Sequence, residues 1–349
     1  MSPGSFMTPP FAIYLGDAKS LSDAKTGAGL AHWRAEECLC EIAGAGCDTT
    51  LGLPRKTVAE AAHLGAKSLV IGVAPFGGRL PESWLPDLIE AAGLGVSIVN
   101  GLHDRLSRKQ DLVDCAAQSG ATLIDVRVPP KDLPVGNGIK RSGLRLLTVG
   151  TDCAVGKKYS ALTITKALQK AGANASFCAT GQTGIMISGR GVPLDAVPCD
   201  FISGAIEQLS PAGPDNHWDV IEGQGSLFHP AYAGVTLGLL HGAQPDVLVL
   251  CHELGRQTIE FHPDYPIPSF KEARDLYLRH ARLTNPKAQI AGVCLNTSRV
   301  ASSEADAACQ AISQSFGVPT IDPLRHSAAP IAQRCLEIAD AVRTHEAGA

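Results

Sequence analysis

One segment of the sequence has the residue types and the spacing of a phosphate-binding loop. The run 150–158, with the sequence GTDCAVGKK, follows an apolar stretch at 144–149 and precedes a stretch at 159–171 that is compatible with a helix. In such a loop, consecutive backbone N–H groups surround an anion, the positive end of the helix faces it, and Lys157 adds a full charge. The sequence therefore predicts a site for a phosphorylated ligand.

The loop departs from the usual pattern G-x-x-x-x-G-K-[ST] at two positions. Thr151 replaces the first glycine, and Lys158 replaces the Ser or Thr that would hold magnesium. We therefore expect an intact anion site that requires no metal. The residues expected to bind the phosphorylated ligand are Gly150, Thr151, Asp152, Cys153, Ala154, Val155, Gly156, Lys157, Lys158 and Tyr159.

The segment 219–232, DVIEGQGSLFHPAY, carries the candidate for proton transfer. Glu222 ends an apolar run and precedes Gly-x-Gly, a pattern that resembles the Walker-B position, where a carboxylate faces the phosphate site. We predict that Glu222 is a general base; the alternative is that it caps the next helix or pairs with Lys157. His229 and Tyr232 are candidate hydrogen-bond donors to a carbonyl group, although a single histidine is often structural.

The segment 179–190 follows another apolar run and is rich in glycine and hydroxyl residues. This composition is typical of a loop whose backbone and side-chain donors contact a ligand, and the guanidinium of Arg190 matches a carboxylate or a phosphate. The expected substrate contacts are Gln182, Thr183 and Arg190. The alternative is a glycine-rich turn with an exposed arginine.

Arg256 follows a third apolar run, 246–251, and is a second candidate anchor for a substrate carboxylate. Pairing with Glu253 or Glu260 is an equally good interpretation. The proline-rich stretch 261–268 is expected to be a loop beside the pocket.

The elements that position these residues alternate along the chain. β-rich runs are expected at 12–15, 68–73, 97–99 and 122–126, between Ala-rich runs such as 56–64 and 84–92, and strands resume at 144–149, 175–179, 220–222, 246–251 and 288–295. Alternation of this kind predicts parallel strands with helical crossovers. We predict an α/β protein with a first domain at 1–128, a Pro- and Gly-rich linker at 129–143 and a P-loop domain at 144–349.

Composition narrows the class of protein. A net charge of −4 argues against a general nucleic-acid binder. The 11 cysteines include no C-x-x-C pair, and the pair Cys38 and Cys40 is assigned to a helix-like segment, so we expect reduced thiols and no structural zinc. Neither a signal peptide nor a membrane-spanning run is recognised. The expectation is a soluble cytoplasmic homo-oligomer with a small-molecule substrate and no nucleic-acid or membrane partner.

Two family resemblances arise at these residues. The string at 150–157 with Glu222-Gly223 resembles dethiobiotin synthetase, which has Thr where this chain has Lys158. A likeness over nearly the whole chain combines the loop at 150–157 with TGQTG at 180–184, EGQGSLFHPAY at 222–232 and GLLHG at 238–242. It resembles a bacterial and archaeal family associated with D-glutamate N-acetylation. This resemblance implies a Rossmann-like N-terminal domain, a C-terminal P-loop domain, acetyl-CoA as the donor and D-glutamate as the acceptor.

The residues are compatible with that chemistry. Coenzyme A carries a pyrophosphate and a 3′-phosphate, whose charge Lys157 and Lys158 can neutralise in place of a metal. Acetyl transfer needs a deprotonated amine, donors for the thioester oxyanion and cations for the two glutamate carboxylates. Glu222 is the expected base, while Lys157, the loop amides or Ser226 serve the oxyanion. Arg190 and Arg256 hold the acceptor.

Two other functions are compatible with a P-loop. One is a magnesium- and ATP-dependent ligase or kinase of the dethiobiotin-synthetase type, and the other is a nucleotide-binding regulatory switch. Lys158 counts against both, because the magnesium ligand is missing from its usual position.

Overall fold

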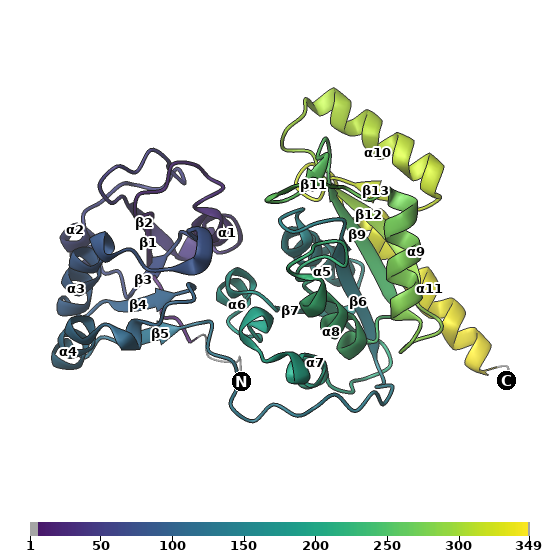
Figure 1. Ribbon diagram of the computed structural model, residues 1–349, viewed down its shortest axis with the longest axis horizontal. Coiled ribbons are helices and arrows are strands. Elements are labelled where there is room, and N and C mark those ends of the chain that lie inside the picture. The colour runs from purple at the N-terminus through teal and green to yellow at the C-terminus, as the bar shows by residue number, and fades with distance from the viewer. Residues whose placement is uncertain (1–5, 348–349) are drawn as a thin grey trace. The chain divides into compact units, whose positions relative to one another are not determined.

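The computed structural model describes residues 6–347, which divide into two compact α/β units (Figure 1). The first unit contains the chain up to Pro129 together with Gln182–Ala196, and the second contains Pro130–Gly181 and the chain from Val197 onward. The sequence did not indicate that 182–196 would return to the first unit. Its backbone leaves the P-loop unit directly after Gly181 and comes back at Val197.

The first unit is built on a five-stranded sheet in the order β2-β1-β3-β4-β5, in which every neighbouring pair is parallel. The strands are β1 (Phe11–Tyr14), β2 (Cys38–Ile42), β3 (Ser68–Ile71), β4 (Ser97–Asn100) and β5 (Leu123–Asp125). Its helices are α1 (Lys25–Trp33), α2 (Val58–His63), α3 (Leu85–Gly93), α4 (Gln110–Ser119) and α6 (Gln182–Ser188). Strands β1, β3 and β4 are apolar and mostly buried, as expected for strands covered on both faces.

Helix α6 corrects the prediction of an irregular loop at 179–190, while contact of this segment with a ligand stays a prediction. Four consecutive residues of this helix, 183–186, are buried, and the helix packs against α1. The hydroxyl oxygen of Thr183 lies 2.9 Å from that of Thr26, and Arg34 donates a hydrogen bond of 2.9 Å to the carbonyl of Met186. Burial of this apolar face favours the helix over the open loop that its glycines suggested.

The assignment of Cys38 and Cys40 to a helix is also wrong. Both lie in β2, where Cys38 pairs with Phe11 and Cys40 pairs with Ala12 of the parallel strand β1. Cys40 is buried in the core of the unit. Pairing with a neighbouring strand overrides the local helical preference of this segment.

The second unit contains a six-stranded parallel sheet in the order β13-β12-β9-β6-β8-β7. Its strands are β6 (Leu144–Gly150), β7 (Asn174–Cys178), β8 (His217–Ile221), β9 (Val247–Glu253), β12 (Gln289–Asn296) and β13 (Thr320–Ile321). Strands β7 and β8, which follow β6 in the chain, lie on one side of β6 in the sheet. The chain then crosses to β9, which lies on the other side of β6. The carboxyl end of β6 is therefore the point where an open α/β sheet binds its ligand.

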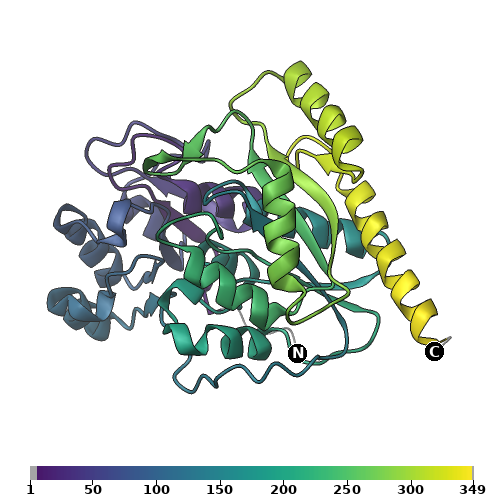
Figure 2. The same cartoon turned by 45° about the vertical axis from the view of Figure 1, so that its right-hand side comes forward.

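Helices cover both faces of this sheet. They are α5 (Lys157–Lys170), α7 (Ile202–Leu209), α8 (Ala233–Ala243), α9 (Phe270–Ala281), α10 (Ser302–Phe316) and α11 (Ala329–Ala347). Figures 1 and 2 show α9 and α11 on opposite sides of the sheet, and α11 packs against α5. Within residues 6–347, no helix combines the length and the apolar character that crossing a membrane requires.

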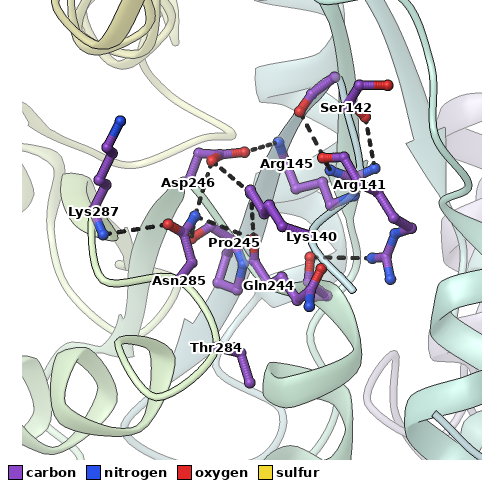
Figure 3. A network of polar contacts seen from close by, with 12 residues as sticks. Lys140, Arg141, Ser142, Arg145, Gln244, Pro245, Asp246, Thr284, Asn285 and Lys287 are labelled. Atoms are coloured by element: carbon purple, nitrogen blue, oxygen red, sulfur yellow. Dashed lines mark hydrogen bonds and ion pairs between the residues drawn. The ribbon is translucent and has the colours of Figure 1, made fainter. Parts of the chain in front are cut away.

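The stretch expected to be a linker, 129–143, contains no helix or strand, but it is fixed to the second unit. The Glu207 carboxylate accepts hydrogen bonds from the backbone N–H groups of Asn137 and Gly138. Lys140 pairs with Asp246 at 2.9 Å, where the strands begin (Figure 3). The stretch therefore has one defined path along the P-loop unit.

Candidate active site

The loop between β6 and α5 has the backbone that its sequence predicts. Gly156 has a φ of 100°, which favours glycine, and α5 begins at Lys157. A Cβ atom at Gly150 would lie 2.8 Å from Cγ2 of Val155 and 3.1 Å from Nζ of Lys157. Thr151 is tolerated at the first glycine position because its φ is not positive. Its hydroxyl contacts Nδ1 of His252 at 2.9 Å.

The two lysines of the loop differ in their surroundings. Lys157 is buried, and its ammonium donates a hydrogen bond of 2.7 Å to the carbonyl of Asp152, within the loop itself. Lys158 is half-buried and lies 4.8 Å from the ring centre of Tyr159. One ammonium is thus held inside the loop, and the second adds positive charge at the start of α5.

Asp152 connects the loop to the segment after β9. Its side chain is fully buried, and it accepts hydrogen bonds from the backbone N–H groups of Cys153 and Glu260 at 2.6 and 2.7 Å. Arg256 donates to the same carboxylate at 2.7 Å, and it also pairs with Glu253. The guanidinium predicted to anchor a substrate is therefore occupied by two carboxylates of its own chain. Its geometry is that of a residue that positions the loop.

Glu222 lies directly after β8 and is buried. Its Oε2 atom accepts hydrogen bonds from the backbone N–H groups of Thr180 and Gly181, at 3.0 and 3.1 Å. Burial raises the pKa of this carboxyl above its usual value, although the two amides and the two loop lysines act in the opposite direction. A carboxylate with a raised pKa is a better proton acceptor than an exposed one.

Ser226 and His229 have opposite capacities for donating a hydrogen bond. Ser226 is fully buried and donates its only hydroxyl proton to the carbonyl of Gly150 at 2.9 Å, so none remains for an oxyanion. His229 is 2% exposed, and its Nδ1 accepts a hydrogen bond of 3.1 Å from the backbone N–H of Ala231. The neutral ring therefore carries its proton on Nε2.

This Nε2 of His229 is buried and has no hydrogen-bond partner within residues 6–347. The backbone carbonyl of Glu260 lies near the His229 ring, but its geometry does not meet the criteria for a hydrogen bond with Nε2. Burial lowers the pKa of His229, which keeps the ring neutral at pH 7. A buried N–H without a partner is unfavourable, and a ligand oxygen would satisfy it.

The proline-rich stretch after β9 corrects another prediction. It is not a loop but the second strand of a hairpin, in which β10 (Thr258–Ile259) pairs antiparallel with β11 (His262–Pro266). The ring of His262 lies 5.0 Å from that of His229, and the ring of Tyr232 lies 4.5 Å from that of His229. The hairpin and the P-loop therefore both lie beside the buried ring of His229.

Asp152, Cys153 and His229 bring three possible metal-binding atoms within 4.8 Å of one another. In this arrangement the three groups are engaged by the chain or keep their protons. The Asp152 oxygens are occupied by Arg256 and two amides, and burial raises the pKa of the Cys153 thiol to about 11. The Nδ1 lone pair of His229 is taken by Ala231, which leaves Nε2 protonated.

The P-loop unit therefore brings together the loop 150–159 with Glu222, Ser226, His229, Tyr232 and Arg256. The other predicted contacts, Gln182, Thr183 and Arg190, belong to the first unit, where Arg190 is exposed. The sequence did not indicate that the amides of Thr180 and Gly181 bind Glu222, or that His252 contacts the loop. These residues lie at the carboxyl ends of two buried strands, and that position is the signal that could have found them.

Comparison with known proteins decides the family. Family models match a Rossmann-like domain of unknown function (DUF1611_N) at residues 41–129 and a P-loop domain of unknown function (DUF1611_C) at residues 134–332. The chain belongs to the DUF1611 family. This confirms the α/β fold with a Rossmann-like N-terminal and a P-loop C-terminal domain.

Two relatives of the chain carry the name of an enzyme. The chain is 48% identical over 317 residues to a D-glutamate N-acetyltransferase of Pseudoalteromonas sp, and 46% identical over 319 residues to one of Tritonibacter scottomollicae. Each match covers 91% of this chain and 96% of the relative. The crystal structure of a DUF1611 family protein from Anabaena variabilis is 34% identical, has a TM-score of 0.87, and the match covers 95% of this chain and all of that one. The resemblance stated from the sequence motifs is confirmed.

Proposed function

We propose that this protein is a D-glutamate N-acetyltransferase that uses acetyl-CoA and requires no metal. The observation that carries the proposal is the identity of 46–48%, over nearly the full length, to two proteins of that name. The P-loop supports the choice of donor, because it keeps the anion-binding backbone and Lys157 but has Lys158 at the position of the magnesium ligand.

The transfer follows from the groups in the site. The amine nitrogen of the acceptor forms a bond with the thioester carbonyl carbon, and the bond from that carbon to the CoA sulfur breaks. The acceptor reacts as the neutral amine, and Glu222 takes the proton that its nitrogen loses as the new bond forms. The CoA thiolate leaves and takes a proton from solvent. The Nε2–H group of His229 donates to the carbonyl oxygen as negative charge develops on it.

Other residues bind the substrates or position the groups that bind them. The loop amides, Lys157 and Lys158 hold the phosphates of CoA, and Arg256 fixes the loop through Asp152. Ser226 has a supporting role, since its proton is committed to Gly150. Gln182, Thr183 and Arg190 stay predicted contacts of the acceptor, and the homo-oligomer stays a prediction as well.

The test is mass spectrometry of the products formed from acetyl-CoA and a panel of D- and L-amino acids, with and without EDTA. We expect N-acetyl-D-glutamate as the main product, formed at the same rate in EDTA. Acetylation of neutral or basic amino acids in preference to glutamate would reject the acceptor. Loss of activity in EDTA, or turnover only with ATP and magnesium, would reject the donor site as described.

A further inference from the structure

The P-loop unit concentrates exposed aromatic side chains at one place. Of the Phe, Tyr and Trp residues whose exposure the structure describes, three are exposed: Phe261 by 72%, Tyr265 by 51% and Tyr232 by 51%. Phe261 and Tyr265 lie in the hairpin formed by β10 and β11, which Figure 1 shows beyond the end of β9, and Tyr232 immediately precedes α8. The remaining aromatic side chains with described exposure are buried or half-buried.

The hairpin is tied to the P-loop. The backbone N–H of Glu260 donates to the Asp152 carboxylate at 2.7 Å, and Arg256, just before the hairpin, donates to the same carboxylate. Ile259 is 2% exposed and anchors the hairpin in the core of the unit. The hairpin therefore has a defined place beside the phosphate site.

A continuous series of ring contacts leads from the loop to the exposed aromatics. His229 has a ring nitrogen within 4.8 Å of Asp152 and Cys153. Its ring lies 5.0 Å from His262, which lies 5.9 Å from Tyr265. The exposed ring of Tyr265 is thus connected to the anion site through the buried ring of His229 and the half-buried ring of His262.

Phe261 stands at the hairpin turn with a φ of 63°, in the left-handed region that phenylalanine rarely adopts. Such conformations are unfavourable and cluster at functional sites. Glycine would suit this turn better, so the ring is kept there at a cost in backbone energy.

A phosphate site beside an aromatic surface has the chemistry of a nucleotide site. Phosphates bind to the loop, and a purine has flat faces that stack on aromatic rings. We propose that Phe261 and Tyr265 form the surface on which the adenine ring of the acyl donor stacks. The proposal rests on the proposed function, because coenzyme A is the donor that joins adenine to a diphosphate and a thioester.

The experiment compares two donors and two variants. Acetyl-CoA contains adenine, whereas S-acetyl-4′-phosphopantetheine keeps the thioester arm and one phosphate and lacks the whole 3′-phospho-AMP part, adenine included. The double variant Phe261→Gly/Tyr265→Ala removes both rings, with glycine at the position whose backbone favours it. Leu283→Ala is the matched control, since Leu283 is 69% exposed and lies near the opposite end of the sheet, after α9.

We expect the double variant to raise the Kd of CoA, measured by calorimetry, and the KM of acetyl-CoA by about 10-fold or more. The KM of S-acetyl-4′-phosphopantetheine and of D-glutamate should stay as in the wild type, and Leu283→Ala should change none of these values. The melting temperature of the double variant should not fall, which separates loss of stacking from loss of the fold.

Each of the contradicting results would assign the rings a different role. An equal loss with both donors would assign the rings to the pantetheine arm, and a raised KM for D-glutamate alone would assign them to the acceptor. Unchanged constants for all three substrates would remove the rings from the site. If the double variant unfolds, Phe261→Leu and Tyr265→Leu keep apolar bulk without a flat ring, and wild-type constants in both would overturn stacking. Wild-type protein that does not bind CoA would overturn the proposed function itself.

Discussion

The hydrogen bonding of buried polar groups differs between the two ends of the P-loop sheet. Where the strands begin, Arg145 is 1% exposed and uses all five of its N–H groups, on the Ser210 hydroxyl and four backbone carbonyls. Asp246 accepts from the backbone of Arg145, from Lys140 and from Asn285 (Figure 3). Where the strands end, the buried Nε2–H group of His229 has no hydrogen-bond partner in the described part of the chain, and the Lys157 ammonium donates to a carbonyl of its own loop.

This difference distinguishes a structural cluster from a ligand site. Polar groups that bond only to their own chain stabilise the fold and have no capacity left for a ligand. Groups that are buried and incompletely bonded reduce stability unless something binds to them. Arg141 and Gln244 are exceptions where the strands begin: Nη1 of Arg141 approaches Glu207 only to 3.8 Å, and the buried Oε1 of Gln244 has no hydrogen-bond partner among the described residues. Variants where the strands begin should therefore lower stability, and variants where the strands end should lower activity or ligand binding.

The largest effect is expected where the strands begin. Arg145→Met removes a donor from five acceptors, and the free energy of unfolding in urea should fall by about 3 kcal/mol or more. The affinity of the folded protein for the acyl donor should be unchanged. Lys140→Met is the control at the same end, because this half-exposed lysine forms a surface ion pair worth roughly 1 kcal/mol or less. Equal stability of the two variants would contradict the structural role of Arg145.

Glu222→Gln should act at the other end of the sheet. It keeps the shape of the side chain and removes its basicity, so turnover should fall by about 100-fold or more. Wild-type kcat should rise with pH through the raised pKa of Glu222, and the variant should lose this dependence. A variant that keeps most of its turnover would exclude Glu222 as the base.

The stability of Glu222→Gln has a definite pH dependence. Burial raises the pKa of Glu222 in the folded state, so its favourable contribution is complete below the unfolded pKa and is lost as pH rises through the folded value. The variant should therefore gain in melting temperature relative to the wild type as pH rises. Glu207→Gln is the matched control: it disturbs two amide contacts of the 129–143 stretch, so it should lower stability and leave turnover unchanged.

Lys157→Ala should weaken donor binding by about 2 kcal/mol or more, since a buried charge-assisted contact to phosphate is lost. Calorimetry with CoA measures the change, and the melting temperature without ligand should stay near that of the wild type. Lys170→Ala removes the same charge from the far end of α5, where the side chain is exposed, and should bind CoA normally. An unchanged Kd in Lys157→Ala would place the phosphates elsewhere.

The sequence predicted the parts of this site that depend on local backbone chemistry. The loop at 150–158 and the position of Glu222 after a buried strand follow from glycine spacing and apolar runs, and both are found as expected. Features that depend on distant contacts could not be read in this way. The helix at 182–188 forms by packing on α1, and Arg256 is occupied by Asp152, 104 residues earlier in the chain. The proton on Nε2 of His229 is fixed by a backbone contact that no side-chain pattern indicates.

The smallest effect is expected for Cys153, although it lies in the loop within 4.8 Å of His229 and Asp152. These residue types would suit a cysteine that carries the acetyl group in a two-step reaction. Burial raises the pKa of the thiol to about 11, and His229 has no free lone pair to accept its proton, so the thiol stays protonated at pH 7. We therefore expect direct transfer from donor to amine, and Cys153→Ala should keep turnover within roughly threefold of the wild type, without the ping-pong kinetics of a covalent intermediate. Intact-mass spectrometry of the wild type with acetyl-CoA alone should find no acetylated protein, with Cys199→Ala, which removes an exposed thiol, as the control for surface acetylation. Stoichiometric acetylation that disappears in Cys153→Ala and is discharged by D-glutamate would show instead that the incomplete bonding of this end of the sheet serves a covalent step.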